Sequence, residues 1–505
     1  MVQRSGDEAQ MLDRYKSDFA EFHTTCAREH YLFHSGQKDN LEIAWIYERY
    51  AHLFERDAID RLKRELANAA PGLDSATVSI GRLLAVAVEQ FLEDSVKRLT
   101  EEISKYEANA IVESGTREMT FQDSTVAITL ERDRERRRAT YAKRLEVIEA
   151  SNGLRAERLL ELHATSRSLG YATYVNLFES LRKLSYSELS RRASIFVSRT
   201  ETVYRARLDD LLRGDLGIRI EDAERCDAMC LLHLTRFDAK FPSARMLGVY
   251  RETMAGLGIR TDLQRNISID SEPRRRKNPR AFCMPVSIPD DVRLVIRPAG
   301  GQSDYQSLLH ESGHAQHYGW ASESLPAEFK YTGDYALTET YAFLFNHLIS
   351  DRNWLETFLG FSDNEEFIRA VILARLVSIR RYSAKLMYET ELHDGDDLAR
   401  SARLYAELQT SATGFKAEPA EFLFDLDDSF YSASYLRAWA FEVLLRDHLK
   451  TRFGLRWWAS PSAGNFLKDI WETGDRYTAD EMISQLGLGP IAFDPLIDEF
   501  NRALR

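Results

Sequence analysis

The sequence predicts a mainly α-helical protein, and three observations support this fold class. Apolar residues recur at the helical period of 3.6 residues over long stretches, such as residues 40–66 and 81–99. Only 12 prolines occur in 505 residues, so few helices are interrupted. Alternating, strand-like patterns are confined to two short stretches. The length is ample for a large core divided between two lobes.

The first predicted helix covers residues 40–66. Its apolar residues return on one helical face, and they are Ile43, Ile46, Tyr47, Tyr50 and Phe54. Residues 81–99, GRLLAVAVEQFLEDSVKRL, repeat this pattern. A domain boundary is expected near residues 151–158, which divides the chain into an N-terminal helical lobe, 1–155, and a larger lobe, 156–505.

Two stretches are expected to form strands. In TVAITL, residues 125–130, apolar side chains alternate with small or polar ones. In residues 281–301, two extended runs flank a Pro-Asp-Asp turn, and Gly300-Gly301 ends the second run. This second stretch predicts a β-hairpin that leads directly into the helix that follows.

Composition and charge exclude several classes of function. The net charge is -12, whereas a general nucleic-acid binder carries a basic footprint. The basic clusters at 134–138 and 274–277 are interpreted as solvated faces. The first 20 residues are polar and charged, and no apolar run approaches the roughly 18 residues that span a bilayer. We therefore expect no nucleic-acid partner and no membrane segment.

The four cysteines are too few for a disulfide framework in a chain of 505 residues. Cys226 and Cys230 have helical spacing and could share a metal ion, but no second Cys or His pair lies near them in the sequence. We interpret them as core residues of one helix. Cysteine usage and the polar N-terminus favour a cytoplasmic location.

The segment LLHESGHAQHYG, residues 308–319, carries the pattern His-Glu-x-x-His. Residues four apart on a helix point the same way, so His310 and His314 can present two imidazoles to one ion. Glu311 lies beside them, where its carboxylate can reach a metal-bound water without binding the metal. Zinc hydrolases use this arrangement, in which the glutamate takes a proton from that water. Two histidines that merely share a helix are the alternative.

A catalytic zinc site needs a third protein ligand. Glu339 lies in a largely apolar helical segment, 336–349, where a carboxylate is costly to bury unless it is paired or bound to metal. It is therefore favoured as the third ligand over an ordinary surface role. The other candidates downstream are Glu323 and Glu328 in a loop around Pro326, Asp334 as a helix N-cap, and His347 as a packing or outer residue. His317 is expected in solvent or behind the ligands.

The helix that carries the motif is expected to start near Asp304. Ser303 and Gln306 have the spacing of a Ser-x-x-Gln capping box. The motif then lies about two turns into this helix.

The chain resembles the thimet oligopeptidase and oligoendopeptidase F family of zinc peptidases over roughly residues 150–500. Glu339 follows His310 by 29 residues, as the third ligand does in that family. KNPRAFCMPV, the strand DVRLVI and GGQSDYQSLLHESGHAQH are similar to the family's approach to its zinc helix, and DSFYSASYLRAWAFEV is similar to its tyrosine-bearing segment.

The resemblance implies an elongated, two-lobed helical metallopeptidase with a deep central channel and a small β-hairpin next to the zinc helix. Residues 156–505 would form the catalytic lobe and hold one Zn²⁺ ion. The partners would be short, unstructured peptides, paired with the strand at 292–297. Tyr431 and Tyr435 match tyrosines that hydrogen-bond the oxyanion in that family, although packing in an aromatic-rich helix is the alternative role.

Three positions depart from the family pattern. Ala438 replaces a further tyrosine, Leu426 replaces a frequent histidine, and Ser312 replaces an apolar residue. The metal set is intact, whereas the oxyanion set has fewer donors. Loss of one such donor typically costs about a hundredfold in rate.

The sequence therefore predicts a zinc-dependent oligopeptidase. His310, His314 and Glu339 hold the metal, Glu311 is the general base, and Tyr435, or secondly Tyr431, stabilises the oxyanion. One alternative is a metal-dependent carboxypeptidase on a related helical fold, which usually carries His-Glu-Ser where this chain has Thr338-Glu339-Thr340. The other is a zinc-containing peptide-binding scaffold with weak or no catalysis.

Overall fold

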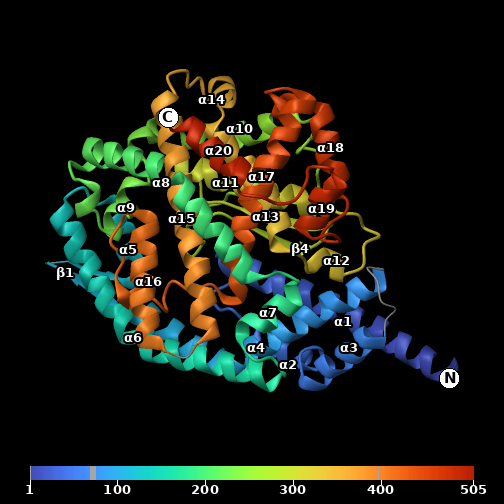
Figure 1. Ribbon diagram of the computed structural model, residues 1–505. Coiled ribbons are helices and arrows are strands. Elements are labelled where there is room, and N and C mark those ends of the chain that lie inside the picture. The colour runs from blue at the N-terminus through green and yellow to red at the C-terminus, as the bar shows by residue number, and fades with distance from the viewer. Residues whose placement is uncertain (1, 69–74, 116, 396) are drawn as a thin grey trace. The chain divides into compact units, whose positions relative to one another are not determined.

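The computed structural model describes residues 2–68, 75–115, 117–395 and 397–505. In this part the chain is mainly α-helical, as predicted, with a two-stranded and a three-stranded sheet (Figure 1). None of the helices in these residues is long and apolar enough to cross a membrane.

The chain forms two compact units, and each is assembled from three segments. Unit 1 contains residues 1–91, 236–364 and 437–491, and unit 2 contains residues 92–235, 365–436 and 492–505. The division expected near residue 155 falls inside the continuous helix α6 (Arg134–Ser168). The chain passes between the units at other points, within α4 (Ser75–Asn109) and α17 (Tyr431–Phe453).

Unit 1 contains both predicted extended runs of the hairpin and the motif helix. Its helices, besides the unit 1 parts of α4 and α17, are α1 (Val2–His34), α2 (Ala44–Arg49), α3 (Arg56–Asn68), α10 (Ser243–Gly256), α11 (Gln302–Trp320), α12 (Glu328–Tyr331), α13 (Tyr335–Asn346), α14 (Arg352–Leu359), α18 (Pro461–Trp471) and α19 (Ala479–Gln485). The single helix expected over residues 40–66 is divided into α2, a 3₁₀ turn and α3.

The sheet of unit 1 contains the predicted hairpin and one strand that was not predicted. β4 (Phe282–Ser287) and β5 (Asp291–Val295) are antiparallel, and β3 (Ile267–Asp270) pairs in parallel with β5. The order is β3-β5-β4, so β5 is the central strand. Helix α1 covers one face, where Tyr31 packs with Val286 and Val295, and α11 packs against β4 and β5.

Unit 2 is built around long helices. Besides the unit 2 parts of α4 and α17, they are α5 (Phe121–Leu130), α6, α7 (Tyr174–Arg182), α8 (Tyr186–Leu216), α9 (Arg225–Leu231), α15 (Glu365–Asp394), α16 (Leu398–Thr413) and α20 (Asp494–Ala503). Helix α15 packs along α8 and α16. A short hairpin joins β1 (Ile111–Ser114) to β2 (Arg117–Thr120).

The strand predicted at residues 125–130 is wrong, because this segment lies in helix α5. Thr120 caps the helix, and its side-chain oxygen accepts a hydrogen bond from the Asp123 N–H. Burial follows the helical period, since Ile128 is buried while Val126 and Leu130 are exposed. The alternating pattern predicted a strand, with these three apolar residues on one face. The Thr120 cap instead favours a helix, in which only Ile128 of the three is buried.

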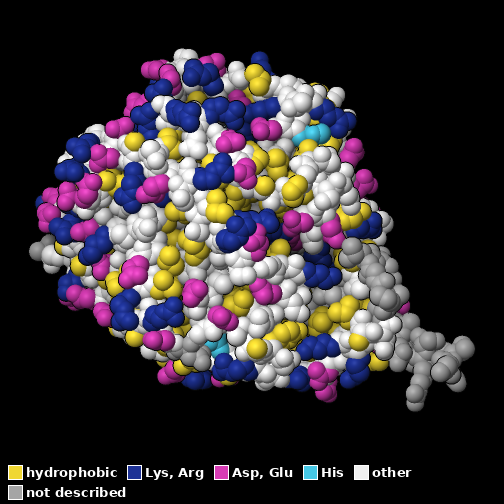
Figure 2. All heavy atoms as spheres, in the orientation of Figure 1, with side chains coloured by type: hydrophobic (Ala, Val, Ile, Leu, Met, Phe, Trp, Pro, Cys, Tyr) yellow, Lys and Arg dark blue, Asp and Glu magenta, His cyan; other side chains and the backbone are white. Residues whose placement is uncertain are grey.

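The basic cluster at residues 134–138 is a solvated face only in part, since Arg136 is exposed whereas Arg137 is buried. Arg137 is fully buried and pairs with buried Asp227, and Arg134 reaches the same carboxylate at 3.1 Å. In the second cluster, Lys277 is also buried and pairs with Asp270 at 2.9 Å. On the face shown in Figure 2, basic and acidic side chains are interspersed over the surface.

Cys226 and Cys230 are buried in α9, as the sequence predicted. Cys226 packs with Ile128 and Tyr141 in a small apolar cluster. These thiols are therefore core residues of unit 2.

Candidate metal centre

The His-Glu-x-x-His motif lies in α11, near the middle of the helix. The helix begins at Gln302, two residues before the expected start, with Gly301 as the N-cap residue. No side-chain cap is formed, so the predicted capping box of Ser303 and Gln306 is wrong. An aspartate outside the helix takes this role, because the Gln302 N–H donates to Asp238 Oδ1 at 3.0 Å.

Gly313, inside the motif, allows α11 and α13 to approach closely. A Cβ atom at this position would lie 2.5 Å from both Ala342 Cα and the Tyr341 carbonyl oxygen. Any side chain there would force the helices apart, because such contacts are shorter than atoms tolerate. The glycine therefore permits the spacing that brings α13 within reach of the two histidines.

The two helices bring His310, His314 and Glu339 together. Glu339 Oε2 lies 3.4 Å from His310 Nε2, and Glu339 Oε1 lies 3.7 Å from His314 Nε2. One ligand atom from each of the three residues lies within 4.8 Å of the other two, and no other such group of His, Cys, Asp and Glu occurs in the described chain. Two imidazoles and one carboxylate are a typical donor set for zinc, so these residues fit such an ion.

The histidines have the protonation state and orientation that a metal ligand needs. Burial lowers the pKa of His310 to about 4, and burial, with the charges of His310 and His317, lowers the pKa of His314 well below its usual value. Both rings are therefore neutral near pH 7. His314 Nδ1 lies 2.8 Å from Thr338 Oγ1, and this contact turns its Nε2 toward Glu339.

Glu311 lies beside these ligands and contacts the sheet. Its Oε2 accepts a hydrogen bond of 2.8 Å from the Cys283 N–H on β4. Burial first, and then the charge of Glu339, raise the pKa of Glu311 to about 8, while the Cys283 hydrogen bond opposes this shift. A cation held by the histidines would favour the charged carboxylate and lower the pKa of Glu311 from this raised value toward neutral pH. At such a pKa the carboxylate can accept and release a proton near pH 7.

Asp334 is the N-cap of helix α13, as predicted, and it stabilises the start of this helix. The Asp334 carboxylate accepts from Ala336 N at 3.1 Å and from both terminal nitrogens of Arg437, at 2.8 and 2.7 Å. Burial alone would raise the pKa of Asp334, but the charge and hydrogen bonds of Arg437 lower it below its usual range. One turn after Glu339, Phe343 lies beside the His310 ring and stacks on Trp439, with ring centroids 4.7 Å apart.

The other candidate ligands lie outside the cluster. Glu323 is exposed, and Glu328 is buried in α12, where it pairs with Lys16 at 2.8 Å. His347 begins a 3₁₀ turn after α13. His317 is fully buried rather than in solvent, with Nε2 3.3 Å from the Gly474 carbonyl oxygen. Ser312, a departure from the family pattern, satisfies its hydroxyl by bonding the Leu308 carbonyl at 2.5 Å.

Tyr431 and Tyr435 belong to unit 2, at the start of α17. Both are partly buried, and their rings pack edge to face with centroids 4.9 Å apart. Tyr435 also packs edge to face against Tyr382 of α15, at 5.0 Å. Ala438 is buried three residues later, and its carbonyl oxygen lies 3.5 Å from Thr340 Oγ1.

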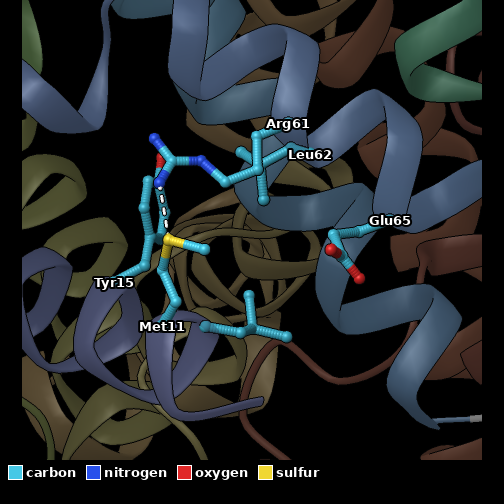
Figure 3. Close-up of a pocket in the computed structure, with 6 residues that line it drawn as sticks. Met11, Tyr15, Arg61, Leu62 and Glu65 are labelled. Atoms are coloured by element: carbon cyan, nitrogen blue, oxygen red, sulfur yellow. Dashed lines mark hydrogen bonds between the residues drawn. The ribbon is translucent and has the colours of Figure 1, made fainter. Parts of the chain in front are cut away.

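A separate hollow in unit 1 contains none of these residues. Figure 3 shows Met11 and Tyr15 facing Arg61, whose terminal nitrogen lies 3.0 Å from the Met11 sulfur. The residues that line the hollow are Met11, Leu12, Tyr15, Arg61, Leu62 and Glu65. They lack the donor set that distinguishes the cluster on α11 and α13.

The fold is similar to that of solved peptidase structures. An X-ray structure of a "putative Oligoendopeptidase F" matches with a TM-score of 0.71 and 14% identity, over 98% of this chain and 92% of that one. A "putative peptidase from Chlamydophila abortus" matches with a TM-score of 0.66 and 12% identity, over 98% of this chain and 89% of that one. No family model matches the sequence. Comparison with curated proteins gives no match. The similarity therefore establishes the fold.

Proposed function

We propose that the protein is a zinc-dependent oligopeptidase that cleaves internal bonds of short, unstructured peptides. The observation that carries this proposal is the convergence of His310, His314 and Glu339, with the Glu311 carboxylate beside them. The fold shared with the two structures named as peptidases supports it.

The residues of the cluster would divide the chemistry between them. His310, His314 and Glu339 would hold one zinc ion, which supplies Lewis-acid activation of water and of the scissile carbonyl. Glu311 would accept a proton from the attacking water and then donate it to the leaving amine. The hydrogen bond from Cys283 N–H restrains Glu311, so one carboxylate oxygen is left for this transfer.

A tyrosine would stabilise the oxyanion, with Tyr435 as the first candidate and Tyr431 as the second. Helix α17 is continuous, so both hydroxyl groups share one helix face through their four-residue spacing. The absence of a tyrosine at residue 438 leaves the set with fewer donors. A Tyr435→Phe change is expected to lower kcat by about a hundredfold.

The peptide would bind along β4 rather than along the strand at 292–297. Both edges of β5 are occupied, by β3 and β4, so this strand cannot accept another chain. β4 is an edge strand of its sheet, and its Cys283 contacts Glu311. The sequence predicted that the peptide pairs with the strand at 292–297, and the strand order moves this expectation to the neighbouring strand, β4.

Two alternatives have a specific motivation. A carboxypeptidase would use the same metal ligands, but Thr338 replaces the histidine that such enzymes usually carry before the third ligand. A peptide-binding scaffold would explain Ala438, but the restrained Glu311 beside the metal ligands has no use in a pure binder.

Mass spectrometry of a mixed peptide pool, after incubation with zinc-loaded wild type or Glu311→Gln, tests the proposal. Internal cuts that are absent with the variant would support the oligopeptidase. Removal of single C-terminal residues would identify the carboxypeptidase. A zinc-loaded wild type that binds peptides without cleaving any of them would be the scaffold.

A further inference from the structure

The backbone of β4 presents alternate residues to its outer edge, and the hydrogen bonds of β5 identify them. Val292 N and Ile296 N donate to Asn266 and Asp270 on the β3 side. The even-numbered residues of β5 therefore face β3, and Arg293 and Val295 face β4. Since Arg293 is opposite Met284 and Val295 is opposite Phe282, those two residues of β4 face inward.

Cys283 and Pro285 consequently direct their backbone groups to the outer edge. The hydrogen bond from Cys283 N–H to Glu311 agrees with this assignment, because that carboxylate lies outside the sheet. Pro285 has no N–H, as expected for a proline in an edge strand. All four residues of β4 from Phe282 to Pro285 are partly exposed.

The outer edge of this segment thus offers acceptors only. The Cys283 N–H is used by Glu311, and Pro285 has none to give. The carbonyl groups of Cys283 and Pro285 face outward with them, since the N–H and C=O of one strand residue point to the same side. From Phe282 to Pro285, the edge presents two carbonyl oxygens and no available N–H.

We propose that β4 recognises two backbone N–H groups of the peptide substrate that lie two residues apart. This inference rests on the proposed function, since it places a peptide on β4 beside Glu311. Successive outward groups of an extended strand repeat every second residue, so two N–H groups of one peptide match Cys283 O and Pro285 O. The substrate class is therefore a peptide without proline or N-methylated residues at these two positions.

The arrangement links substrate recognition to the position of the base. The same residue, Cys283, restrains Glu311 through its N–H and accepts a substrate N–H through its carbonyl. Carbonyl groups of the peptide that face this segment have no N–H from which to accept a hydrogen bond. The peptide can therefore pair with β4 over only a few residues.

The test uses one peptide that wild type cleaves and a set of analogues in which single N–H groups are removed. Each analogue carries either an N-methyl group or an ester in place of one amide, away from the scissile bond. We expect kcat/KM to fall about tenfold when the N–H is removed at position i or at position i+2, because one hydrogen bond to β4 is lost in each case. Removal of the N–H at i+1 is expected to change kcat/KM little. A uniform response, or losses at adjacent positions, would overturn the proposal.

Pro285→Ala and Met284→Ala form a matched pair of variants. Pro285→Ala adds an outward N–H and is expected to raise kcat/KM for the parent peptide about two- to tenfold. Met284→Ala leaves the outward groups unchanged and is expected to retain the i, i+2 pattern. No gain in Pro285→Ala would contradict the assignment of Pro285 as the missing donor.

Binding of the same analogues to zinc-loaded Glu311→Gln separates the two proposals. The glutamine oxygen can still accept from Cys283, and turnover does not interfere. If wild type cleaves no peptide, the analogues are made from a peptide that it binds, and an i, i+2 pattern in affinity would then uphold the inference and reject the oligopeptidase. Cleavage by wild type with a uniform pattern in both measurements would reject the inference alone.

Discussion

Each unit contains a pair of neighbouring histidines contributed by helices, but the two pairs are built differently. In unit 1, His310 and His314 direct their Nε2 atoms toward one carboxylate, Glu339. In unit 2, His163 Nε2 lies 3.0 Å from His393 Nδ1, so the two rings bond to each other. The described chain brings a third ligand only to the first pair.

Proximity alone does not supply a pair of histidines with the third protein ligand that a zinc site needs. The pair in unit 2 is enclosed by aromatic rings, and Tyr174 stacks on His393 with centroids 4.4 Å apart. Arg158 adds a nearby positive charge that disfavours a cation. The pair in unit 1 has a buried carboxylate to offset the charge of an ion. The following predictions test this distinction.

The largest effect is expected from Glu339→Gln. The variant loses the charged ligand, and zinc affinity should fall by more than the 10- to 100-fold typical of residues behind the ligands. Metal analysis after dialysis against a chelator measures this loss. The control is Glu328→Gln, which changes another buried glutamate of unit 1. Equal zinc content in both variants would remove Glu339 from the metal site.

Thr338→Val is expected to have a smaller effect on the same site. Valine keeps the shape but removes the oxygen that contacts His314 Nδ1, so zinc affinity should fall about 10- to 100-fold. Titration with a competing chelator measures the shift. Thr340→Val is the matched control, because the Thr340 hydroxyl bonds the Ala336 carbonyl instead. A Thr338→Val protein with wild-type affinity would show that this contact does not orient His314.

His393→Leu should leave zinc content unchanged and lower only stability. The substitution removes the ring that bonds His163 inside unit 2, and we expect the free energy of unfolding to fall by about 1–3 kcal/mol. Urea unfolding and metal analysis of one preparation measure both quantities. Zinc loss at unchanged stability would make the pair in unit 2 a metal site after all.

The smallest effect is a difference in pH dependence. Burial first, and then His163 and Arg158, hold the pKa of His393 well below its usual value. Below about pH 6.5 the unfolded chain binds a proton that the folded protein excludes, so stability falls as pH decreases. His393→Leu should lose up to about 1.4 kcal/mol less per pH unit than wild type below pH 6.5. Parallel curves for the two proteins would contradict this.

The sequence predicted the fold class, the hairpin of β4 and β5, and the cluster residues because each has a local signal. Helical periodicity and a four-residue spacing can be read directly from neighbouring residues. The burial of Glu339 was also predictable, since its segment is largely apolar. A buried carboxylate in such a segment needs a partner, and a metal ion held by the two histidines would be one.

Other features depend on contacts between distant segments. The place of β5 at the centre of its sheet depends on β3, and the N-terminal contact of α11 depends on Asp238. The helical state of residues 125–130 depends on the Thr120 cap, which outweighed an alternating pattern. Gly313 was visible inside the motif, and a glycine in a helix interior is a signal for close packing that could have been used.

The three-segment construction of unit 1 has a consequence for the order in which the protein can fold during synthesis. Arg437, which fastens Asp334, and Gly474, which contacts His317, follow the motif by more than a hundred residues. Unit 1 is complete only when the ribosome has released the chain to about residue 491. Until then the nascent helices α11 and α13 lack these contacts, so we expect the proposed metal centre to form only after residues 437–491 have been synthesised.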